Sequence, residues 1–218
     1  MKKIALIMLG VGGQDGSEPT ETVSASISLS ELKAQITFFS FDQEFICQNH
    51  KTRKQEENQT RNALIESCRL TRGKSLSIEE LNPDDYDALV LPGGSGLLKN
   101  LSNFSIDNEK FSVHLSLEKA ILKFHEQSKP IGAICIAPFL VAQVLKKYHP
   151  LITLGETSEL IPRLKKMNIQ HENCPSNDYI TDRDCKLLST PAYMNDEVTP
   201  FEVHTGIRLM IKELVEMA

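Results

Sequence analysis

The sequence predicts an α/β protein in which a mostly parallel sheet is covered by helices on both faces. Short apolar runs, the pattern of strands buried on both faces, alternate with longer stretches that show helical spacing. That alternation is typical of a parallel sheet with crossover helices. The 218 residues are 40% hydrophobic and 24% charged, the composition of an ordinary folded protein. Because no repeat, low-complexity tract or linker interrupts the pattern, residues 1–218 are expected to form one domain.

The amino-terminal half is expected to supply three strands and two helices. The first strand, residues 3–8, is a continuous apolar run followed by a glycine-rich turn. A helix begins near residue 18, where Pro19 is tolerated because the N–H it lacks would have no helical partner. This first helix extends to about residue 34. The elements after it are a strand at 36–41, a polar loop at 42–59 with a short excursion around 45–47, a helix at 60–72 closed by Gly73, and a strand at 87–91.

The carboxyl-terminal half continues the alternation. Residues 113–127 predict an amphipathic helix in which Leu117, Ile121 and Phe124 share one stripe. A strand at 130–134 runs directly into Cys135. The elements after it are a helix at 136–147, a short strand at 151–154, a helix at 159–167, a hairpin over 179–189 with its turn at 182–184, and a closing helix at 201–217.

Composition and charge exclude several classes of protein. With 24 Lys and Arg against 29 Asp and Glu, the net charge is −5 and argues against duplex binding, so no nucleic-acid partner is expected. The short basic run at 51–54 is interpreted as a solvated loop. No apolar stretch approaches the roughly 18 residues that span a membrane, and the first run is too short for a signal peptide. Five unevenly spaced cysteines then indicate free thiols in a reducing compartment, and a cytoplasmic location is expected.

Cys135 is the strongest candidate for chemistry. It lies between an apolar strand and a helix, and a side chain on such a tight turn is lifted above the sheet, as in nucleophile elbows. The following helix N-terminus is expected to stabilise a thiolate and lower the thiol pKa. The alternative is a buried structural cysteine, which is common because free Cys is among the most buried residue types.

Two further segments are expected at the same edge of the sheet, because ligands gather at the carboxyl ends of parallel strands. Glu18 follows the first strand and can face the nucleophile, sharing a proton with it. The alternative for Glu18 is helix capping. The run Pro92-Gly93-Gly94 offers bare backbone whose N–H groups, with that of Ile136, can hold an oxyanion; alternatively it is a simple tight turn.

Two other patterns carry less weight. The glycines at 10, 12 and 16 miss the spacing of a dinucleotide-binding loop by one residue, so no NAD or FAD is expected. The pairs Cys47 with His50 and His171 with Cys174 contain zinc-ligand residue types, but neither lies in a ribbon-like context. We expect neither a cofactor nor a metal.

The chain resembles the ThiJ/PfpI superfamily, also called class I glutamine amidotransferase-like. Within it, seven blocks resemble the ElbB branch of isoprenoid-biosynthesis, glyoxalase-like proteins, and together they span residues 15–194 in the same order. The blocks are Asp15-Gly16-Ser17-Glu18, Thr60-Arg61-Asn62, Thr71-Arg72-Gly73, Pro92-Gly93-Gly94, Lys99-Asn100-Leu101-Ser102-Asn103-Phe104, Cys135-Ile136-Ala137-Pro138 and Thr190-Pro191-Ala192-Tyr193-Met194.

This resemblance implies a flavodoxin-like three-layer α/β sandwich, usually a homodimer. It implies Cys135 as the nucleophile, Glu18 as its acid/base partner, and Gly94 and Ile136 as the oxyanion-hole donors. The implied activity is the cofactor-free conversion of small 2-oxoaldehydes, glyoxal or methylglyoxal, to hydroxy acids. The competing interpretations are a stress protein that acts through oxidation of Cys135 and a binding protein without turnover.

The chain also departs from the family pattern at two places. Ile136 stands where protease-like members carry His directly after the nucleophile, which argues against a Cys-His peptidase. Gln14, Pro19 and Thr20 occupy the positions of an aromatic, an aliphatic and a His residue near the first strand. If that His acts in the pocket, the activity here is weaker or the substrate is different.

Overall fold

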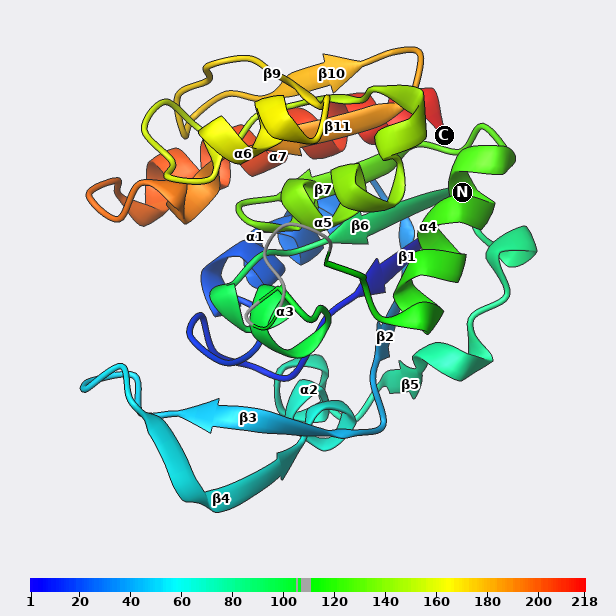
Figure 1. Cartoon of the computed structure of the whole chain (residues 1–218). Helices are drawn as coiled ribbons and strands as arrows, with labels where there is room; N and C mark the ends of the chain where they lie inside the picture. The colour runs from blue at the N-terminus through cyan, green and yellow to red at the C-terminus, as the bar shows by residue number, and fades with distance from the viewer. Residues whose placement is uncertain (105, 107–110) are drawn as a thin grey trace.

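The computed structural model describes residues 1–104, 106 and 111–218. Its centre is a seven-stranded sheet in which neighbouring strands are parallel, except for the antiparallel pair at one edge (Figure 1). In sheet order the strands are β10 (Ile180–Asp182), β11 (Leu187–Thr190), β7 (Ile131–Ile134), β6 (Ala88–Leu91), β1 (Lys3–Ile7), β2 (Gln35–Ser40) and β5 (Ser75–Ser77). The mostly parallel sheet and the hairpin at 179–189 are therefore confirmed.

Helices cover both faces of the sheet and make it a three-layer sandwich of the flavodoxin-like type. On one face α1 packs against α7, and on the other α4 packs against α5 (Figure 1). The helices are α1 (Pro19–Glu31), α2 (Ala63–Thr71), α3 (Ser95–Asn100), α4 (Leu115–Glu126), α5 (Ala137–Val144), α6 (Ile161–Lys166) and α7 (Pro200–Met217). Short 3₁₀ turns lie at Ile78–Glu80, Pro83–Asp85, Lys146–Tyr148 and Ala192–Met194.

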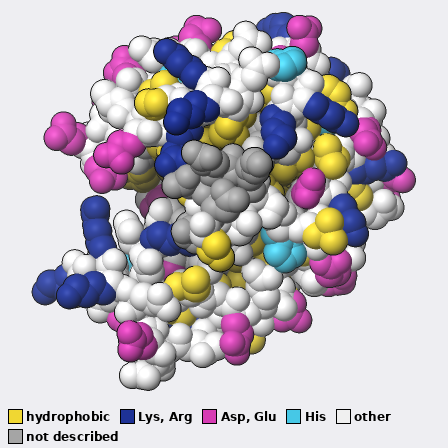
Figure 2. All heavy atoms as spheres, viewed as in Figure 1, with side chains coloured by type: hydrophobic (Ala, Val, Ile, Leu, Met, Phe, Trp, Pro, Cys, Tyr) yellow, Lys and Arg dark blue, Asp and Glu magenta, His cyan; other side chains and the backbone are white. Residues whose placement is uncertain are grey.

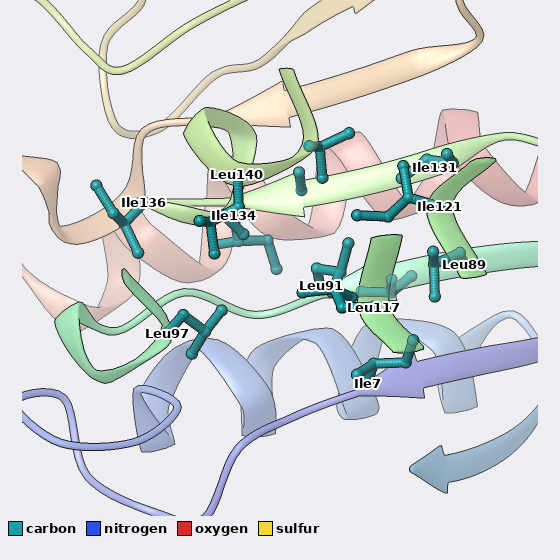
Figure 3. Close-up of a cluster of buried hydrophobic side chains, with 14 of the residues drawn as sticks. Ile7, Leu89, Leu91, Leu97, Leu117, Ile121, Ile131, Ile134, Ile136 and Leu140 are labelled. Carbon is teal, nitrogen blue, oxygen red and sulfur yellow. The ribbon is translucent and has the colours of Figure 1, made fainter. Parts of the chain in front are cut away.

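The core lies where the central strands meet the helices. Every residue of β6 and β7 is buried, which explains why these strands appear in the sequence as unbroken apolar runs. Leu117 and Ile121 of α4 pack onto the strands from one side (Figure 3). From the other side α7 approaches so closely that a Cβ at Gly132 would lie 2.7 Å from Leu214. Burying each Leu or Ile side chain here contributes about 1.5–3 kcal/mol.

The polar segment at 42–59 is a projecting β-hairpin and not the loop that the sequence predicted. Its strands are β3 (Glu44–Gln48) and β4 (Gln55–Asn62), which pair with each other outside the main sheet (Figure 1). The prediction was wrong because β4 is polar throughout and largely exposed, so no alternation of apolar residues marks it. Helix α2 consequently begins at Ala63, capped by the Asn62 side chain, and not at residue 60.

Three other elements differ from the sequence prediction. The edge strand β5 and the one-and-a-half-turn helix α3 were not predicted, because both are too short to show a period. The strand expected at 151–154 is β8 (Leu151–Ile152), which pairs with β9 (Gln170–His171) in a separate two-stranded sheet. Among the described residues, no helix is long and apolar enough to cross a bilayer.

Candidate active site

Cys135 stands on a strained turn between β7 and α5. Its φ is +60°, a left-handed conformation that residues with a side chain rarely adopt. The turn is held in place because the Cys135 N–H donates to the carbonyl of Thr190 at 2.9 Å, which continues the β7–β11 ladder past the end of the strand. Such strain costs about 1–3 kcal/mol and persists only where the surrounding structure fixes it. The result is a thiol presented at the carboxyl edge of the sheet with 7% of the residue's surface exposed.

Two backbone N–H groups point at the Cys135 sulfur. They belong to Gly94, which follows β6, and to Ile136, the residue before α5. Gly94 has a φ of +106°, and a Cβ there would collide with the carbonyl oxygen of Gly16 in the loop after β1. A glycine is therefore required at 94 for the β6 turn to bring its N–H to the sulfur. Both donors expected from the sequence lie at the thiol.

Glu21, which the sequence analysis did not single out, is the carboxyl group hydrogen-bonded to the Cys135 thiol. It lies on the first turn of α1 and is completely buried. Gly93 N–H donates to its Oε2 at 2.8 Å, and Tyr193 N–H points at its Oε1 from 3.5 Å. Burial, and then the charge of Glu18, raise the pKa of Glu21 to about 8. Most molecules therefore carry this carboxyl group protonated at pH 7.

Glu18 lines the same cavity as Cys135, but its carboxylate also caps α1. Its Oε2 accepts the N–H of Glu21 at 2.7 Å, because Pro19 begins the helix and leaves Glu18 at the capping position. Burial raises the pKa of Glu18. The structure thus brings Glu18 to the site, as expected, and places Glu21 nearer to the thiol. The missed signal is the three-residue spacing, which puts Glu21 one helical turn after Glu18 on the same side.

The expectation of a lowered thiol pKa at Cys135 is wrong. Burial, followed by the charge of the Glu21 carboxylate, raises the pKa of the Cys135 thiol well above its usual value. The N–H groups of Gly94 and Ile136 act in the opposite direction but do not outweigh burial. At neutral pH the site therefore holds a thiol beside a carboxylic acid, and a thiolate forms when a proton leaves this pair.

An open cavity of about 800 Å³ lies over Cys135. The three segments expected at the carboxyl ends of the strands all contribute to it. The hairpin adds His50 and Arg53, which the sequence analysis did not assign to the site. The lining residues are Gly12, Gly13, Gln14, Glu18, Pro19, His50, Arg53, Gly94, Ser95, Cys135, Ile136, Tyr193, Met194 and Asp196. Gln14 and Pro19, two of the three departures from the family pattern, are thus at the pocket.

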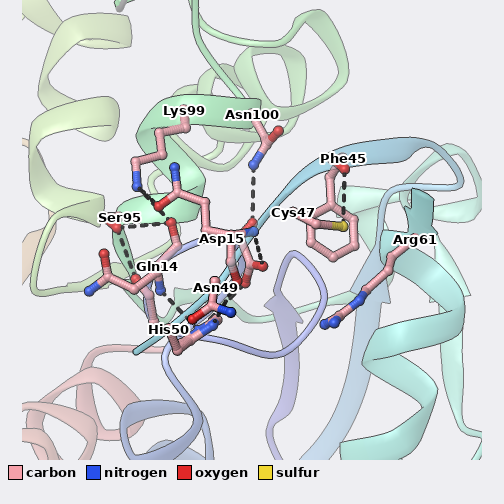
Figure 4. A network of polar contacts seen from close by, with 12 residues as sticks. Gln14, Asp15, Phe45, Cys47, Asn49, His50, Arg61, Ser95, Lys99 and Asn100 are labelled. Atoms are coloured by element: carbon pink, nitrogen blue, oxygen red, sulfur yellow. Dashed lines mark hydrogen bonds and ion pairs between the residues drawn. The ribbon is translucent and has the colours of Figure 1, made fainter. Parts of the chain in front are cut away.

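A polar network fixes the hairpin to this site (Figure 4). Asp15 is completely buried, and its Oδ2 accepts the N–H of Gln48 at 2.8 Å. Asn100 of α3 links the hairpin to the loop after β1. Its Oδ1 accepts the N–H of Ile46, and its Nδ2 donates to the carbonyl of Asp15. The Lys99 ammonium donates to the carbonyl of Gln14 at 2.8 Å. Lys99 and Asn100, the first two residues of the block at 99–104, therefore anchor the hairpin beside the pocket.

The residues considered for a dinucleotide loop or a zinc site form neither, although Gly12, Gly13 and His50 among them line the cavity. The glycine-rich turn after β1 packs so closely against α3 that a Cβ at Gly96 would collide with the backbone of Asp15. Cys47 is buried with its thiol directed at the carbonyl of Phe45, and Cys174 lines a different, smaller pocket. In the part of the chain that the structure describes, no three His, Cys, Asp or Glu side chains are grouped so that they could hold a metal ion.

Comparisons with known proteins identify the fold and the family. Residues 7–147 match the model of the DJ-1/PfpI family. A crystal structure of an isoprenoid biosynthesis protein with an amidotransferase-like domain from Ehrlichia chaffeensis superimposes with a TM-score of 0.92 at 31% identity, over 100% of this chain and 99% of that one. Schizosaccharomyces pombe DJ-1 shares the fold with a TM-score of 0.57 at 15% identity, over 99% of this chain and 91% of that one.

Curated relatives correct one expectation and settle the family. The chain is 32% identical to the rat ES1 protein homolog, mitochondrial, over 99% of this chain and 84% of that protein. It is 31% identical to the human glutamine amidotransferase-like class 1 domain-containing protein 3, mitochondrial, over 99% of this chain and 83% of that protein. Because these relatives are named mitochondrial, the expectation of a cytoplasmic location is wrong. On the matched residues and on similarities that cover at least 99% of this chain, the chain belongs to the DJ-1/PfpI family.

Proposed function

We propose that this protein is a cofactor-independent, glyoxalase-like enzyme that converts small 2-oxoaldehydes such as glyoxal and methylglyoxal to 2-hydroxy acids. The observation that supports this most directly is the arrangement around Cys135. Its sulfur faces an open cavity, two N–H groups are directed at it, and the Glu21 carboxyl group is hydrogen-bonded to it. A nucleophile, a proton acceptor and two oxyanion donors are what aldehyde addition needs.

The first step is addition of the thiol to the aldehyde. Ionised Glu21 accepts the Cys135 proton as the sulfur forms a bond to the aldehyde carbon. The aldehyde oxygen becomes an oxyanion, which the N–H groups of Gly94 and Ile136 hold until it takes a proton. The product of this step is a neutral hemithioacetal. A pKa of about 8 at Glu21 suits this exchange, because a group that titrates near neutral pH both accepts and returns a proton readily.

The second step moves a proton between the two substrate carbons. A carboxylate removes the C–H proton of the hemithioacetal carbon, and the ketone oxygen becomes an enediol oxygen. Return of a proton to the other carbon gives a 2-hydroxy thioester, and water then releases the hydroxy acid and restores the thiol. We assign the carbon-to-carbon transfer to Glu18, which lines the cavity, and the sulfur proton to Glu21. The net reaction adds one water to the 2-oxoaldehyde, so no oxidant or cofactor is consumed.

Methylglyoxal consumption by purified variants tests this proposal. Cys135→Ala is expected to abolish turnover with the fold intact, because the substitution removes only the sulfur. Cys174→Ala is the matched control, a buried thiol that lines a different pocket. Glu18→Gln and Glu21→Gln are each expected to lower kcat by about 100-fold or more. Unchanged turnover in Cys135→Ala would refute the mechanism, and unchanged turnover in Glu18→Gln alone would leave Glu18 as a helix cap.

A second candidate function is redox sensing through Cys135, with no turnover. The same N–H groups and the protonated Glu21 carboxyl can donate hydrogen bonds to the oxygens of an oxidised sulfur. On this alternative, dilute peroxide modifies Cys135 in preference to Cys68, a half-buried thiol, and methylglyoxal is not consumed. Mass spectrometry of the two peptides, together with the aldehyde assay, separates the two functions.

A further inference from the structure

The tip of the β3–β4 hairpin forms the basic side of the pocket mouth. We call residues 50–54 the basic tip, since they comprise His50, Lys51, Arg53 and Lys54 with one threonine. His50 and Arg53 line the cavity that contains Cys135, although they are far from Cys135 in the sequence. Figure 2 shows Lys and Arg side chains gathered where the hairpin projects from the body. The segment interpreted as a solvated loop thus borders the candidate active site.

His50 makes polar contacts through both ring nitrogens at this rim. Its Nδ1 is 3.1 Å from the carbonyl of Gln48, and its Nε2 is 3.6 Å from Oδ1 of the buried Asp15 (Figure 4). Oδ1 of Asp15 has no hydrogen-bond partner among the described residues. Gln14 N–H also points at Nε2, from 3.4 Å. The ring donates from Nδ1 to the Gln48 carbonyl and accepts the Gln14 N–H at Nε2, and these two contacts orient His50 at the rim.

Arg53 is the residue of the basic tip whose permanent charge lies at the cavity. Its guanidinium lies 3.9 Å from the carboxylate of Asp196, on the opposite side of the mouth, and both side chains are mostly exposed. An exposed ion pair at that distance contributes little stability. A bound anion can therefore displace Asp196 and take the two parallel N–H groups of the guanidinium, which match a carboxylate or phosphate in geometry.

Positive charge at the mouth is concentrated on the hairpin side, in the basic tip. Arg53 lines the cavity, and Lys51 and Lys54 lie beside it in the basic tip without lining the cavity. The acidic lining residues are Glu18 and Asp196, while Glu21 lies behind the thiol and is mostly protonated at pH 7. The cavity of about 800 Å³ is also of the size that holds ligands much larger than the five non-hydrogen atoms of methylglyoxal.

We propose that the basic tip binds an anionic group of the substrate, a carboxylate or a phosphate, while the aldehyde carbon reaches Cys135. The preferred substrates are then 2-oxoaldehydes with an anionic group at the far end, and methylglyoxal is a truncated analogue. This inference rests on the proposed glyoxalase-like function for its reaction, but the anion site itself is defined by Arg53 and His50 and can be tested without turnover.

The binding test uses unreactive probes and amide NMR spectra of the full chain. Succinate and inorganic phosphate are titrated separately, and succinamide serves as the neutral match to succinate. We expect saturable shifts at Gly13, Gln14, His50 and Arg53 with the anions, and binding about fivefold weaker in Arg53→Gln. Arg183→Gln is the control, because Arg183 is an exposed arginine paired with Glu213 and does not line the cavity. If neither anion shifts these amides, or if succinamide shifts them equally, the anion site does not exist.

The turnover test compares 4,5-dioxopentanoate, an anionic 2-oxoaldehyde, with its neutral methyl ester. We expect kcat/KM to be at least about fivefold higher for the acid, with this preference lost in Arg53→Gln and kept in Arg183→Gln. An equal kcat/KM for the two compounds, or a preference that survives in Arg53→Gln, would overturn the proposed substrate class. If the anions bind but the wild-type protein consumes neither aldehyde, the glyoxalase-like function fails and the anion site stands.

Discussion

At the scale of single residues, the site depends on a competition between burial and hydrogen bonding at Cys135. The sequence places this thiol before a helix, which predicts a stabilised thiolate, yet burial and Glu21 raise its pKa. The free energy needed to remove the thiolate charge from water exceeds the stabilisation that hydrogen bonds from two N–H groups provide. A reactive cysteine here therefore requires an acid/base partner and cannot rely on its position alone.

Replacing Glu21 should make the Cys135 thiolate form at lower pH. In Glu21→Gln the buried negative charge is removed, and a thiolate no longer faces a carboxylate, so the thiol pKa falls. The pH profile of iodoacetamide alkylation at Cys135, followed by peptide mass spectrometry, should shift to lower pH in the variant. Cys68 provides the internal control, since its profile should be the same in both proteins. A profile at Cys135 that stays in place or moves upward would show that Glu21 does not control this thiol.

The residues of the site differ in how visible they are in the sequence. Cys135, Gly94 and Ile136 could be predicted, because strand-turn-helix patterns and a Gly-Gly turn mark them. Glu21 could not, since its role depends on Glu18 taking the capping position and on burial against Gly93. His50 was equally hidden, because only the folded hairpin brings it to Asp15.

At the scale of elements, the main sheet was predictable and the hairpin was not. Buried strands such as β6 and β7 show continuous apolar runs, whereas both faces of β4 are largely solvated and its sequence resembles a loop. An isolated two-stranded hairpin is only marginally stable in water. The hairpin is instead held by Asp15 and Asn100, whose partners are backbone groups that a sequence pattern does not reveal.

Removing the Asn100 side chain should loosen the hairpin and leave the sheet unchanged. Asn100→Ala takes away the acceptor of the Ile46 N–H and the donor to the Asp15 carbonyl. Hydrogen exchange should become faster for amides of β3 and β4, by about tenfold if roughly 1–2 kcal/mol is lost locally, while β1 and β6 keep their protection. Gln59→Ala, an exposed change on β4, is the control. Equal protection of the hairpin in both variants would mean that other contacts hold it.

At the scale of the whole molecule, the parallel sheet determines where chemistry is possible. The loops after β1, β6 and β7 meet at one edge because these strands are adjacent and parallel, and the pocket lies there.

The homodimer implied by the family resemblance stays a prediction. Sedimentation equilibrium should give a mass near twice the 24.4 kDa of the chain, and a monomer at micromolar concentration would contradict it.

The buried acid at the site also links its chemistry to the stability of the whole fold. The pKa of Glu21 is about 8 in the folded protein, and about 4.5 is its ordinary value when exposed. Between these two values the folded state binds a proton that the unfolded chain has lost. The free energy of unfolding should therefore be highest below about pH 4.5, as far as this group is concerned, and fall as pH rises towards 8.

Glu21→Gln should remove this dependence, because a glutamine does not ionise. Urea unfolding at pH 5, 6, 7 and 8 should show wild-type stability falling by several kcal/mol relative to the variant, of the order of 1.4 kcal/mol for each pH unit. The variant is expected to be the more stable protein at pH 8, where the wild type begins to bury a charge. Glu31→Gln, an exposed carboxylate paired with Arg208, is the control and should keep the wild-type slope. Parallel curves for wild type and Glu21→Gln would mean that Glu21 is already ionised in the folded protein, and its role as a proton acceptor for Cys135 would then need no prior deprotonation.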